Sequence, residues 1–355
     1  MTVLVTGGAG FIGANVANAL LAAGEPVRIL DDLSRPGVER NVRWLESHHG
    51  SRLELLIADV RDPSSVARAL EGIEHVFHFA AQVAVTTSID RPRLDFEVNA
   101  GGTLTLLEAM RACPRPPSLI YTSTNKVYGS LDDVALRQTE RRYEPESSKL
   151  AAAGISEQRP LSFCSPYGCS KGTADQYVLD YAHTFGLRTV VFRMSCIYGP
   201  RQLGNEDQGW VAHFLLRALR GEPITIFGDG RQVRDVLYVD DLVDALLRAR
   251  ARIAHISGRA FNVGGGPTST TSLVELVERI TRLTGRSPQL AFEPWRRADQ
   301  RWYVSDVSAL TAAIDWAPRT SLGDGVAHLF DWLSRQDVAH TGPGARIRVG
   351  GVEAR

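Results

Sequence analysis

The fold of this chain is decided by Gly7-Gly8-Ala9-Gly10-Phe11-Ile12-Gly13, which lies between a first apolar strand and a first helix. Gly7, Gly10 and Gly13 follow the spacing G-x-x-G-x-x-G. Small residues let the backbone approach a pyrophosphate, and a helix N-terminus directs unpaired N–H groups and its positive dipole end at that anion. The turn therefore predicts a dinucleotide-binding strand–helix unit, with a tight turn that binds nothing as the alternative.

The first half of the chain repeats this pattern of a short β-branched strand, a turn and an amphipathic helix. We expect strands at 3–5, 27–30, 53–58, 75–79, 118–122 and 188–194, and helices at 12–23, 63–71, 98–112 and 166–186. The alternation predicts an α/β fold with a doubly wound parallel sheet, Rossmann-like, covered by helices.

After Gly199 the rhythm changes to loops rich in Gly, Pro and Asp, which predicts a smaller, irregular C-terminal substrate lobe. We expect helices there near 210–220, 239–252, 272–284 and 325–335, and a short strand at 261–263. The predicted dinucleotide-binding domain covers 1–197 plus roughly 234–260, the substrate lobe roughly 198–233 plus 261–335, and a flexible tail 336–355.

Composition narrows the class of protein. The 355 residues carry 40 basic and 40 acidic side chains, so no overall field favours nucleic acid or a membrane surface. Apolar runs stay short of a membrane span, and the N-terminus leads straight into a strand, which predicts a cytoplasmic protein. The four cysteines lack metal-site spacing, so we expect free thiols and no metal.

Carboxylates follow the second and third expected strands. Asp31 and Asp32 end the second strand, where a carboxylate can accept hydrogen bonds from an adenosine ribose and repel a 2′-phosphate. This favours NAD over NADP, and the alternative is that the pair only opens a surface turn. Asp59-Val60 and Ala80-Ala81 follow the next two strands and should border the same crevice.

A second motif, Ser165-Pro166-Tyr167-Gly168-Cys169-Ser170-Lys171, opens the helix expected at 166–186. Pro166 suits a first helical turn, and the spacing of four puts Tyr167 and Lys171 on one face. A phenol has a pKa of about 10, so it becomes a useful base only when a nearby cation stabilises the phenolate. Lys171 can supply that charge, although such a pair also occurs by chance on surface helices.

Hydroxyl groups gather where the strand at 118–122 ends, in Tyr121-Thr122-Ser123-Thr124. We expect Thr124 to reach the substrate oxygen that loses a proton. Thr122 and Ser123 have the simpler alternative of capping the strand end.

Together, the glycine turn, Asp31, Ser123-Thr124, Tyr167-x-x-x-Lys171 and the stretch 193–199 resemble extended short-chain dehydrogenases/reductases over residues 1 to about 335. The resemblance implies an NAD-dependent hydride shuttle in which Tyr167 takes a sugar hydroxyl proton and a keto sugar forms. It implies a homodimer through helices 98–112 and 166–186. The implied NAD contacts are Gly7, Gly10, Phe11, Ile12, Gly13, Asp31, Asp32, Asp59, Val60, Ala80, Ala81, Asn99, Tyr167 and Lys171.

Asn99 enters this set only by its family position on the nicotinamide side, and its alternative role is to cap a helix. Sugar-nucleotide dehydratases of the family carry Thr-Asp-Glu after the strand, because expelling water needs an acid and a base. This chain has Thr124-Asn125-Lys126 instead, which favours an epimerase, although Lys126 can in principle act as an acid or base.

Longer strings are similar to CDP-tyvelose (CDP-paratose) 2-epimerases, namely 123–129, 165–171 with 175–177, and 201–202 with 207–210. In that family the transient ketone forms at C2 of a nucleotide sugar. The substrate contacts expected with this resemblance are Thr124, Asn125, Gln208, Trp210, Arg234 and Arg301, the two arginines binding the diphosphate. Trp210 can equally pack between the lobes.

Two alternatives stay open. The same site can act at C4, or on a UDP- or GDP-sugar. A non-catalytic NAD-binding scaffold would keep the fold but would not depend on the Tyr167 hydroxyl.

Overall fold

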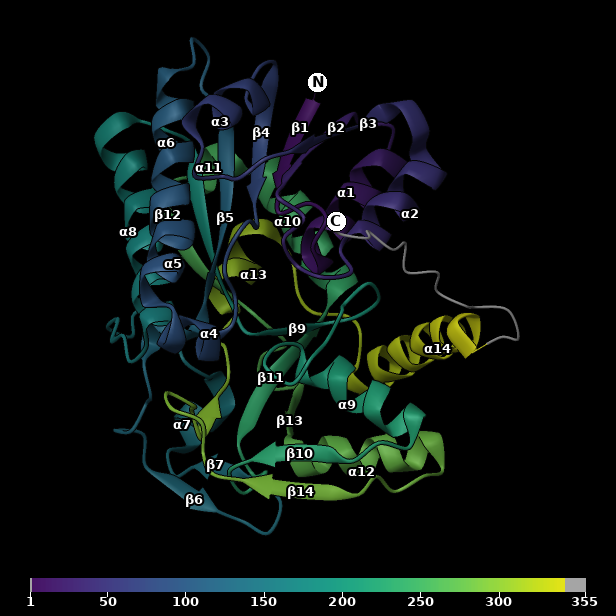
Figure 1. The fold of residues 1–355 in the computed structure, drawn as a ribbon. Helices are drawn as coiled ribbons and strands as arrows, with labels where there is room; N and C mark the ends of the chain where they lie inside the picture. The colour runs from purple at the N-terminus through teal and green to yellow at the C-terminus, as the bar shows by residue number, and fades with distance from the viewer. Residues whose placement is uncertain (1, 342–355) are drawn as a thin grey trace, which may run out of the picture.

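The computed structural model describes the backbone of residues 2–341 and the side chains of residues 2–336. Within this range the main sheet has seven parallel strands in the order β12-β8-β5-β4-β1-β2-β3 (Figure 1). The strands are β1 (Thr2–Thr6), β2 (Val27–Asp31), β3 (Leu53–Ile57), β4 (Ile73–His78), β5 (Ser118–Thr124), β8 (Thr189–Met194) and β12 (Arg259–Val263). The doubly wound parallel sheet is thus confirmed.

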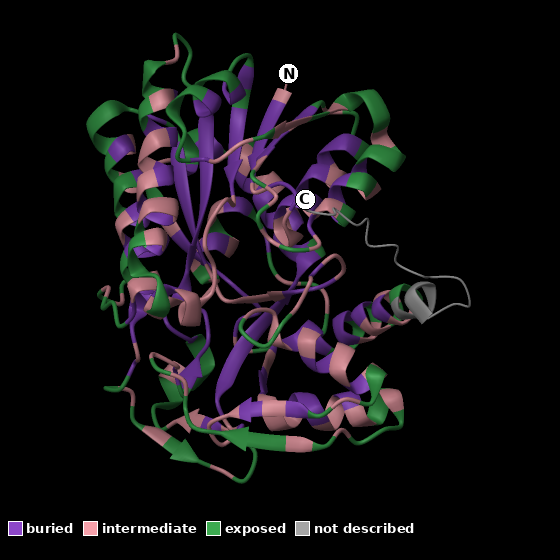
Figure 2. Ribbon diagram, in the orientation of Figure 1, coloured by how far each residue is buried: buried purple, intermediate pink, exposed green. Residues whose placement is uncertain are grey.

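Helices cover both faces of this sheet because its strands are apolar on both sides. Val3 and Val5 of β1 pack toward one layer, whereas Leu4 between them packs toward the other. One layer holds α1 (Phe11–Ala22), α2 (Glu39–His49), α10 (Val239–Ala251), α11 (Ile253–Ile256) and α13 (Ser308–Ile314); the other holds α3 (Pro63–Ala69), α6 (Gly102–Ala112) and α8 (Pro166–Phe185). Figure 2 shows the buried strands between helices whose outward faces are exposed.

The order of the strands creates a crevice beside β1. The chain runs from β1 outward through β2 and β3, and then returns to place β4 on the opposite side of β1. Helices leave in opposite directions at such a switch point, so the carboxyl ends of β1 and β4 border an open space.

A smaller lobe lies below these carboxyl ends in Figure 1 and has its own apolar core. Its strands are β9 (Cys196–Tyr198), β10 (Ile224–Phe227), β11 (Val233–Tyr238), β13 (Thr270–Ser272), β14 (Leu290–Glu293) and β15 (Trp302–Tyr303). Its helices are α9 (Trp210–Arg220), α12 (Leu273–Thr284) and α14 (Leu322–Thr341).

Shorter elements lie between the longer ones in both parts. They are η1 (Gly50–Arg52), α4 (Val85–Asp90), α5 (Pro92–Phe96), the π-helical η2 (Glu97–Gly101), η3 (Asn125–Tyr128), β6 (Leu136–Gln138), β7 (Tyr143–Pro145) and α7 (Ser148–Ala153). In the part of the chain that the structure describes, no helix has the length and apolar character to cross a bilayer. All four cysteines are free.

The expected lobe boundaries differ from the structure in two places. β12 pairs with β8 in the main sheet, so the strand at 261–263 does not belong to the smaller lobe. Phe261 and Val263 are fully buried in the main core, which explains the placement. Conversely, the segment around Val127 and Ile155 packs against Val233 and Tyr303 of the smaller lobe.

The C-terminal helix also runs further than expected. A flexible tail was predicted from 336, but α14 continues to Thr341. No glycine or proline interrupts the sequence between 336 and 341, so nothing in it ends the helix earlier. The rest of the predicted tail lies outside the described residues.

Candidate active site

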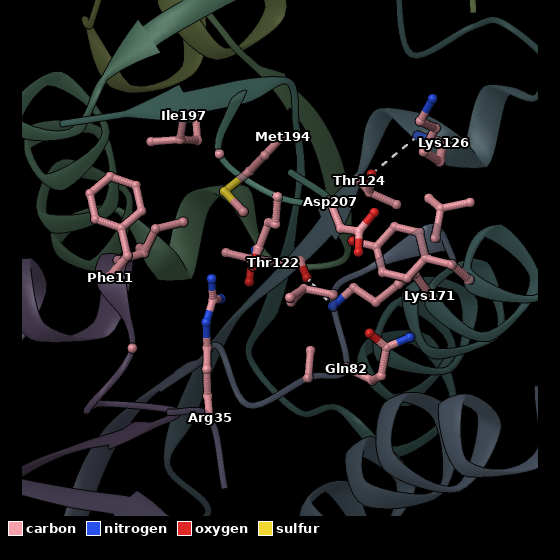
Figure 3. Close-up of a pocket in the computed structure, with 18 of the residues that line it drawn as sticks. Phe11, Arg35, Gln82, Thr122, Thr124, Lys126, Lys171, Met194, Ile197 and Asp207 are labelled. Carbon is pink, nitrogen blue, oxygen red and sulfur yellow. Dashed lines mark hydrogen bonds between the residues drawn. The ribbon is translucent and has the colours of Figure 1, made fainter. Parts of the chain in front are cut away.

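A cavity of about 800 Å³ lies at the carboxyl ends of the main sheet, between the two lobes. Figure 3 shows Phe11 and Ile197 on one side of it and Thr124 and Lys171 on the other. It is lined by most of the residues expected from sequence, namely Gly7, Gly10, Phe11, Ile12, Gly13, Asp31, Asp32, Asp59, Val60, Ala80, Ala81, Thr124, Asn125, Tyr167, Lys171, Gln208, Trp210 and Arg234.

The glycine turn leaves no room for side chains. A Cβ on Gly13 would lie 2.3 Å from the Gly7 carbonyl oxygen, and one on Gly7, at φ +67°, would lie 2.6 Å from the Ala80 nitrogen. Gly10 caps α1 without a side-chain hydrogen bond, so the first N–H groups of the helix remain available. This cradle fits the pyrophosphate of a dinucleotide.

The carboxylates beyond β2 and β3 take different positions. Asp31 accepts hydrogen bonds from the Ala9 N–H (3.0 Å) and the Leu33 N–H (2.9 Å), which holds it beside the glycine turn. Burial raises the pKa of Asp31. Asp32 is exposed and accepts from Ser34, as expected for a surface turn. Asp31 is therefore the better placed of the two to meet a ribose diol.

Two further groups lie on this side of the cavity. Asp59 pairs with Arg61, with 2.6 Å between the Arg61 Nη2 and Asp59 Oδ2 atoms. Arg35 also lines the cavity and donates to the Leu203 carbonyl oxygen of the smaller lobe (3.1 Å). Sequence reasoning missed Arg35, because an arginine in an exposed loop gives no periodic signal.

Local chemistry fixes the start of α8. The Ser165 hydroxyl accepts from the Gly168 N–H (3.1 Å), and Pro166 occupies the first turn. The Tyr167 N–H donates to the Ser88 hydroxyl of α4 (3.1 Å). A capped and anchored first turn holds Tyr167 and Lys171 toward the same cavity.

Lys171 is buried and directs its ammonium at the end of β5. Its Nζ atom donates to the Thr122 carbonyl oxygen (2.6 Å; Figure 3). The same atom lies 4.3 Å from the centre of the Tyr121 ring. Burial lowers the pKa of Lys171 to about 7, against the opposing effect of Asp175 and Asp95. Burial likewise raises the pKa of Tyr167 to about 12, while a hydrogen bond with Thr124 lowers it.

The three hydroxyl groups at the end of β5 have separate surroundings. The Thr122 hydroxyl donates to the His78 carbonyl oxygen (3.2 Å), a structural role. The Thr124 hydroxyl faces the cavity and accepts from the Lys126 N–H (3.2 Å). The Ser123 hydroxyl is buried, lines the cavity and has no hydrogen-bond partner among the described residues, so it is free for a ligand.

Asn99 does not line the cavity. It lies within η2 rather than at a helix start, because the helical path begins upstream at Pro92. Its amide nitrogen donates to the Gln82 carbonyl oxygen (3.0 Å) and the Ser170 hydroxyl (3.0 Å), and its amide oxygen accepts from the Gln82 N–H (2.9 Å). Its place within η2 contradicts the helix cap, and its amide links the Gln82 loop to α8. The cofactor contact stays a prediction.

The opposite end of the cavity is lined by the smaller lobe. Trp210 opens α9 and meets Phe214 edge-on, with 5.9 Å between ring centres, so it packs within the lobe as well as lining the cavity. Arg234 is buried and donates to Asp299 (2.6 Å, Nη2 to Oδ1). Lys126 Nζ lies 3.6 Å from the same Asp299 oxygen, so one carboxylate is shared by two cations.

Arg301 does not join this group. Its side chain is exposed, and its guanidinium lies over the rings of Tyr143 (5.7 Å) and Trp295 (5.9 Å). Arg296 and Arg297 line the cavity instead, and Arg296 stacks 3.8 Å above the Phe227 ring. The sequence did not single them out, because the loop before β15 has no period that reveals which side chains turn inward.

Known proteins resemble this chain along nearly its whole length. A family model described as the NAD dependent epimerase/dehydratase family matches residues 3–264. The CDP-paratose 2-epimerase of Salmonella typhi is 44% identical over 341 residues, which cover 94% of this chain and 99% of that protein. A UDP-glucose 4-epimerase of Mycolicibacterium smegmatis is 34% identical over 94% of this chain and 98% of that protein.

The fold also matches a solved structure. The UDP-glucose 4-epimerase of Thermus thermophilus in complex with NAD superimposes with a TM-score of 0.79 at 32% identity, covering 94% of this chain and 99% of that one. The glycine cradle, the Tyr167–Lys171 pair and the family match agree, and the chain belongs to the NAD dependent epimerase/dehydratase family.

Proposed function

We propose that this protein is a nucleotide-sugar epimerase that inverts C2 of CDP-paratose or CDP-tyvelose through a transient keto sugar. The observation that carries the choice of substrate is the 44% identity, over nearly the full length of both chains, to a CDP-paratose 2-epimerase. The chemistry is supported by Thr124, Tyr167 and Lys171, which border one cavity.

These three residues manage the proton of the sugar hydroxyl. Tyr167 accepts it as the carbon–oxygen bond becomes a carbonyl and returns it when the alcohol re-forms. Thr124 hydrogen-bonds the phenol and orients the sugar oxygen. Lys171, held by the Thr122 carbonyl oxygen, keeps a positive charge beside the phenolate.

Bound NAD supplies a reversible hydride acceptor for the sugar carbon. The cradle of Gly7, Gly10 and Gly13 would hold its pyrophosphate, and Asp31 its adenosine ribose. Inversion at that carbon would require the keto sugar to turn within the cavity, so that its opposite face meets the bound cofactor.

The residues after β5 argue against a dehydratase. Lys126 donates to the Ala298 carbonyl oxygen (3.2 Å) and lies beside Asp299, so a cation occupies this wall of the cavity. Asn125 is neutral and donates to the Gln300 side chain (3.2 Å). An ammonium held between a carbonyl and a carboxylate does not replace the acid pair that expels water.

A UDP-sugar 4-epimerase is the second candidate. It is favoured by the 34% identical UDP-glucose 4-epimerase, because the same three residues can serve C4 if the sugar binds in another orientation.

Proton NMR separates the candidates. The purified protein with added NAD is incubated in D₂O with CDP-paratose, and in parallel with UDP-glucose, UDP-galactose, CDP-glucose and GDP-mannose. We expect CDP-paratose to gain the anomeric and H2 signals of its C2 epimer, with protium retained at C2 because hydride returns internally. Conversion of UDP-glucose alone would show that the substrate is a UDP-sugar and not CDP-paratose.

A Tyr167→Phe variant is the matched control for the chemistry. It should keep its NAD and lose nearly all turnover, because a phenyl ring accepts no proton. Full turnover by this variant would overturn the proton-transfer role.

The assembly and compartment are proposals of the same kind. We propose a homodimer through α6 and α8, which lie together on the outer side of the main sheet (Figure 1). The four free thiols are in keeping with the reducing cytoplasm as its compartment.

A further inference from the structure

A buried carboxylate beside the proposed catalytic pair has no part in the chemistry described above. Asp95 of α5 is 1% exposed. It accepts hydrogen bonds from the Gln82 amide nitrogen (2.8 Å), the Asn99 amide nitrogen (3.2 Å) and the Ser170 hydroxyl (2.5 Å). Ser170 directly precedes Lys171 in α8, so this network ties α5 to the turn that carries the catalytic pair.

None of the three donors to Asp95 carries a charge. Among the side chains of residues 2–336, no arginine or lysine forms an ion pair with Asp95 within 4.0 Å. Asp175 is the other carboxylate that raises the pKa of Lys171, and unlike Asp95 it is paired with an arginine. Both of its oxygens accept from Arg193, each at 2.9 Å, so that charge is neutralised within the core.

We propose that Asp95 is a positioning residue that anchors the first turns of α8. Among the described side chains, it supplies the one unneutralised negative charge that acts on the Lys171 ammonium. The proposal rests on the proposed function only in giving that ammonium a catalytic purpose. The electrostatic relation itself is independent of the substrate.

The groups around Lys171 fix the sign of the effect. From β4, His78 is neutral, because burial lowers its pKa to about 3. From β5, Tyr121 offers only its ring, and within α8 Tyr167 is an uncharged phenol at neutral pH. Asp95 raises the pKa of Lys171 against burial and also raises that of Tyr167.

Asp95→Asn is the decisive variant. Asparagine has the same shape, can accept from Gln82 and Asn99 through its oxygen, and can donate to the Ser170 hydroxyl through its nitrogen. It therefore removes the charge while it keeps the network. The pKa of Lys171 should fall by about one pH unit, as expected when an opposite charge nearby is lost.

The small number of lysines makes the pKa of Lys171 measurable without an assay of turnover. The sequence has only three lysines, Lys126, Lys149 and Lys171. Lysine labelled with ¹³C and ¹⁵N gives three side-chain signals, assigned with single Lys→Arg variants and titrated with and without NAD. Exposed Lys149 and Asp299-paired Lys126 serve as internal controls, and both should titrate as in the wild type.

Ser170→Ala is the control for a purely structural role. It removes the shortest hydrogen bond to Asp95 but keeps the charge. It should lower the unfolding midpoint and leave the pKa of Lys171 within a few tenths of a unit of the wild type. Should Asp95→Asn fold poorly, Asp95→Ser removes the same charge with a smaller side chain.

Two results would overturn the proposal: an unchanged Lys171 titration in a folded charge-free variant, or an equal fall for all three lysines. If the proposed substrate proves active, the pH profile of turnover gives a second reading. Both its acidic and alkaline limbs should move to lower pH in Asp95→Asn, because the pKa values of Tyr167 and Lys171 fall together. Failure of the substrate assignment leaves the lysine titration intact.

Discussion

At the scale of single residues, burial works against the charged forms of both Tyr167 and Lys171. Burial raises the pKa of Tyr167 to about 12 and lowers that of Lys171 to about 7, so each group alone is driven toward its neutral form. Proton removal from a sugar hydroxyl at neutral pH therefore depends on several partners acting together. The Thr124 hydrogen bond lowers the pKa of Tyr167, and the carboxylates of Asp175 and Asp95 raise that of Lys171. Asp95 also raises the pKa of Tyr167, so it favours the ammonium at some cost to the phenolate.

Arg234 and Arg301 offer a matched test of the diphosphate site. Arg234 lines the cavity, whereas Arg301 is exposed over two aromatic rings. Arg234→Met should raise KM for the nucleotide sugar roughly thirtyfold, because one charge-assisted hydrogen bond contributes about 2 kcal/mol. Arg301→Met should change KM less than about threefold. Steady-state kinetics on both variants checks this, and equal effects would contradict the placement of Arg301.

The site residues that were predictable from sequence lie on short motifs at strand ends and in a first helical turn. Topology places such positions at one edge of a parallel sheet, so Asp31, Thr124 and Tyr167 could be brought together before any coordinates. Asn99 and Arg301 are different. Their backbone positions lie close to the site, but competing partners, Gln82 and Ser170 for one and two aromatic rings for the other, turn their side chains away.

At the scale of elements, the turn between β1 and α1 sets how closely a dinucleotide can approach. Gly13→Ala would place a Cβ 2.3 Å from the Gly7 carbonyl oxygen and 2.7 Å from the Gly8 Cα atom, both backbone atoms that cannot rotate away. We expect the helix to shift, a loss of about 2 kcal/mol in the free energy of unfolding, and purified protein without NAD.

Gly101→Ala is the control for that substitution, since its Cβ would lie 3.9 Å from the nearest atom, in helical backbone with φ −62°. It should keep both its NAD and its stability. Urea unfolding and the NAD content of each purified variant measure the two effects. Retention of NAD by Gly13→Ala would show that the dinucleotide still binds when the backbone of the turn lies further from it.

The long helices and the apolar strands of the main sheet were predictable, and the strands of the smaller lobe were not. α8, α9 and α12 begin and end within about two residues of the expected bounds, because caps and amphipathic repeats mark them. β9, β11 and β15 lie among loops rich in Gly, Pro and Asp, without the regular alternation of strand and helix that marks the main sheet. Their pairing is decided by tertiary contacts instead, as when Val233 of β11 packs against Trp302 and Tyr303.

At the scale of the whole molecule, the two lobes interleave along the chain. β12 and α13 return to the main core after the smaller lobe has been entered, and η3 leaves it early. A boundary drawn from composition cannot reveal such returns, because apolar strands look alike in either lobe. The cavity between the lobes thus depends on crossings that no local stretch of sequence encodes.

The outer surface of α6 and α8 carries the last prediction. Tyr177, Tyr181 and Phe185 are four residues apart on α8, and Tyr177 and Phe185 remain 44% and 43% exposed. Tyr181 between them is buried and hydrogen-bonds Glu108 of α6, so the row lies against the neighbouring helix. Two exposed aromatic side chains on one helix face are typical of a contact between copies, and a twofold axis would bury the same pair on each copy.

Phe185→Glu should therefore convert a dimer into a monomer, because it places a charge within the proposed contact. Phe292→Glu is the control, since Phe292 is 57% exposed on β14 in the other lobe and should leave the dimer intact. Light scattering after size-exclusion chromatography, over a range of concentrations, gives the mass of each. A wild type with the mass of one chain at every concentration would refute the dimer, and dissociation by the Phe292 variant alone would move the contact to the smaller lobe.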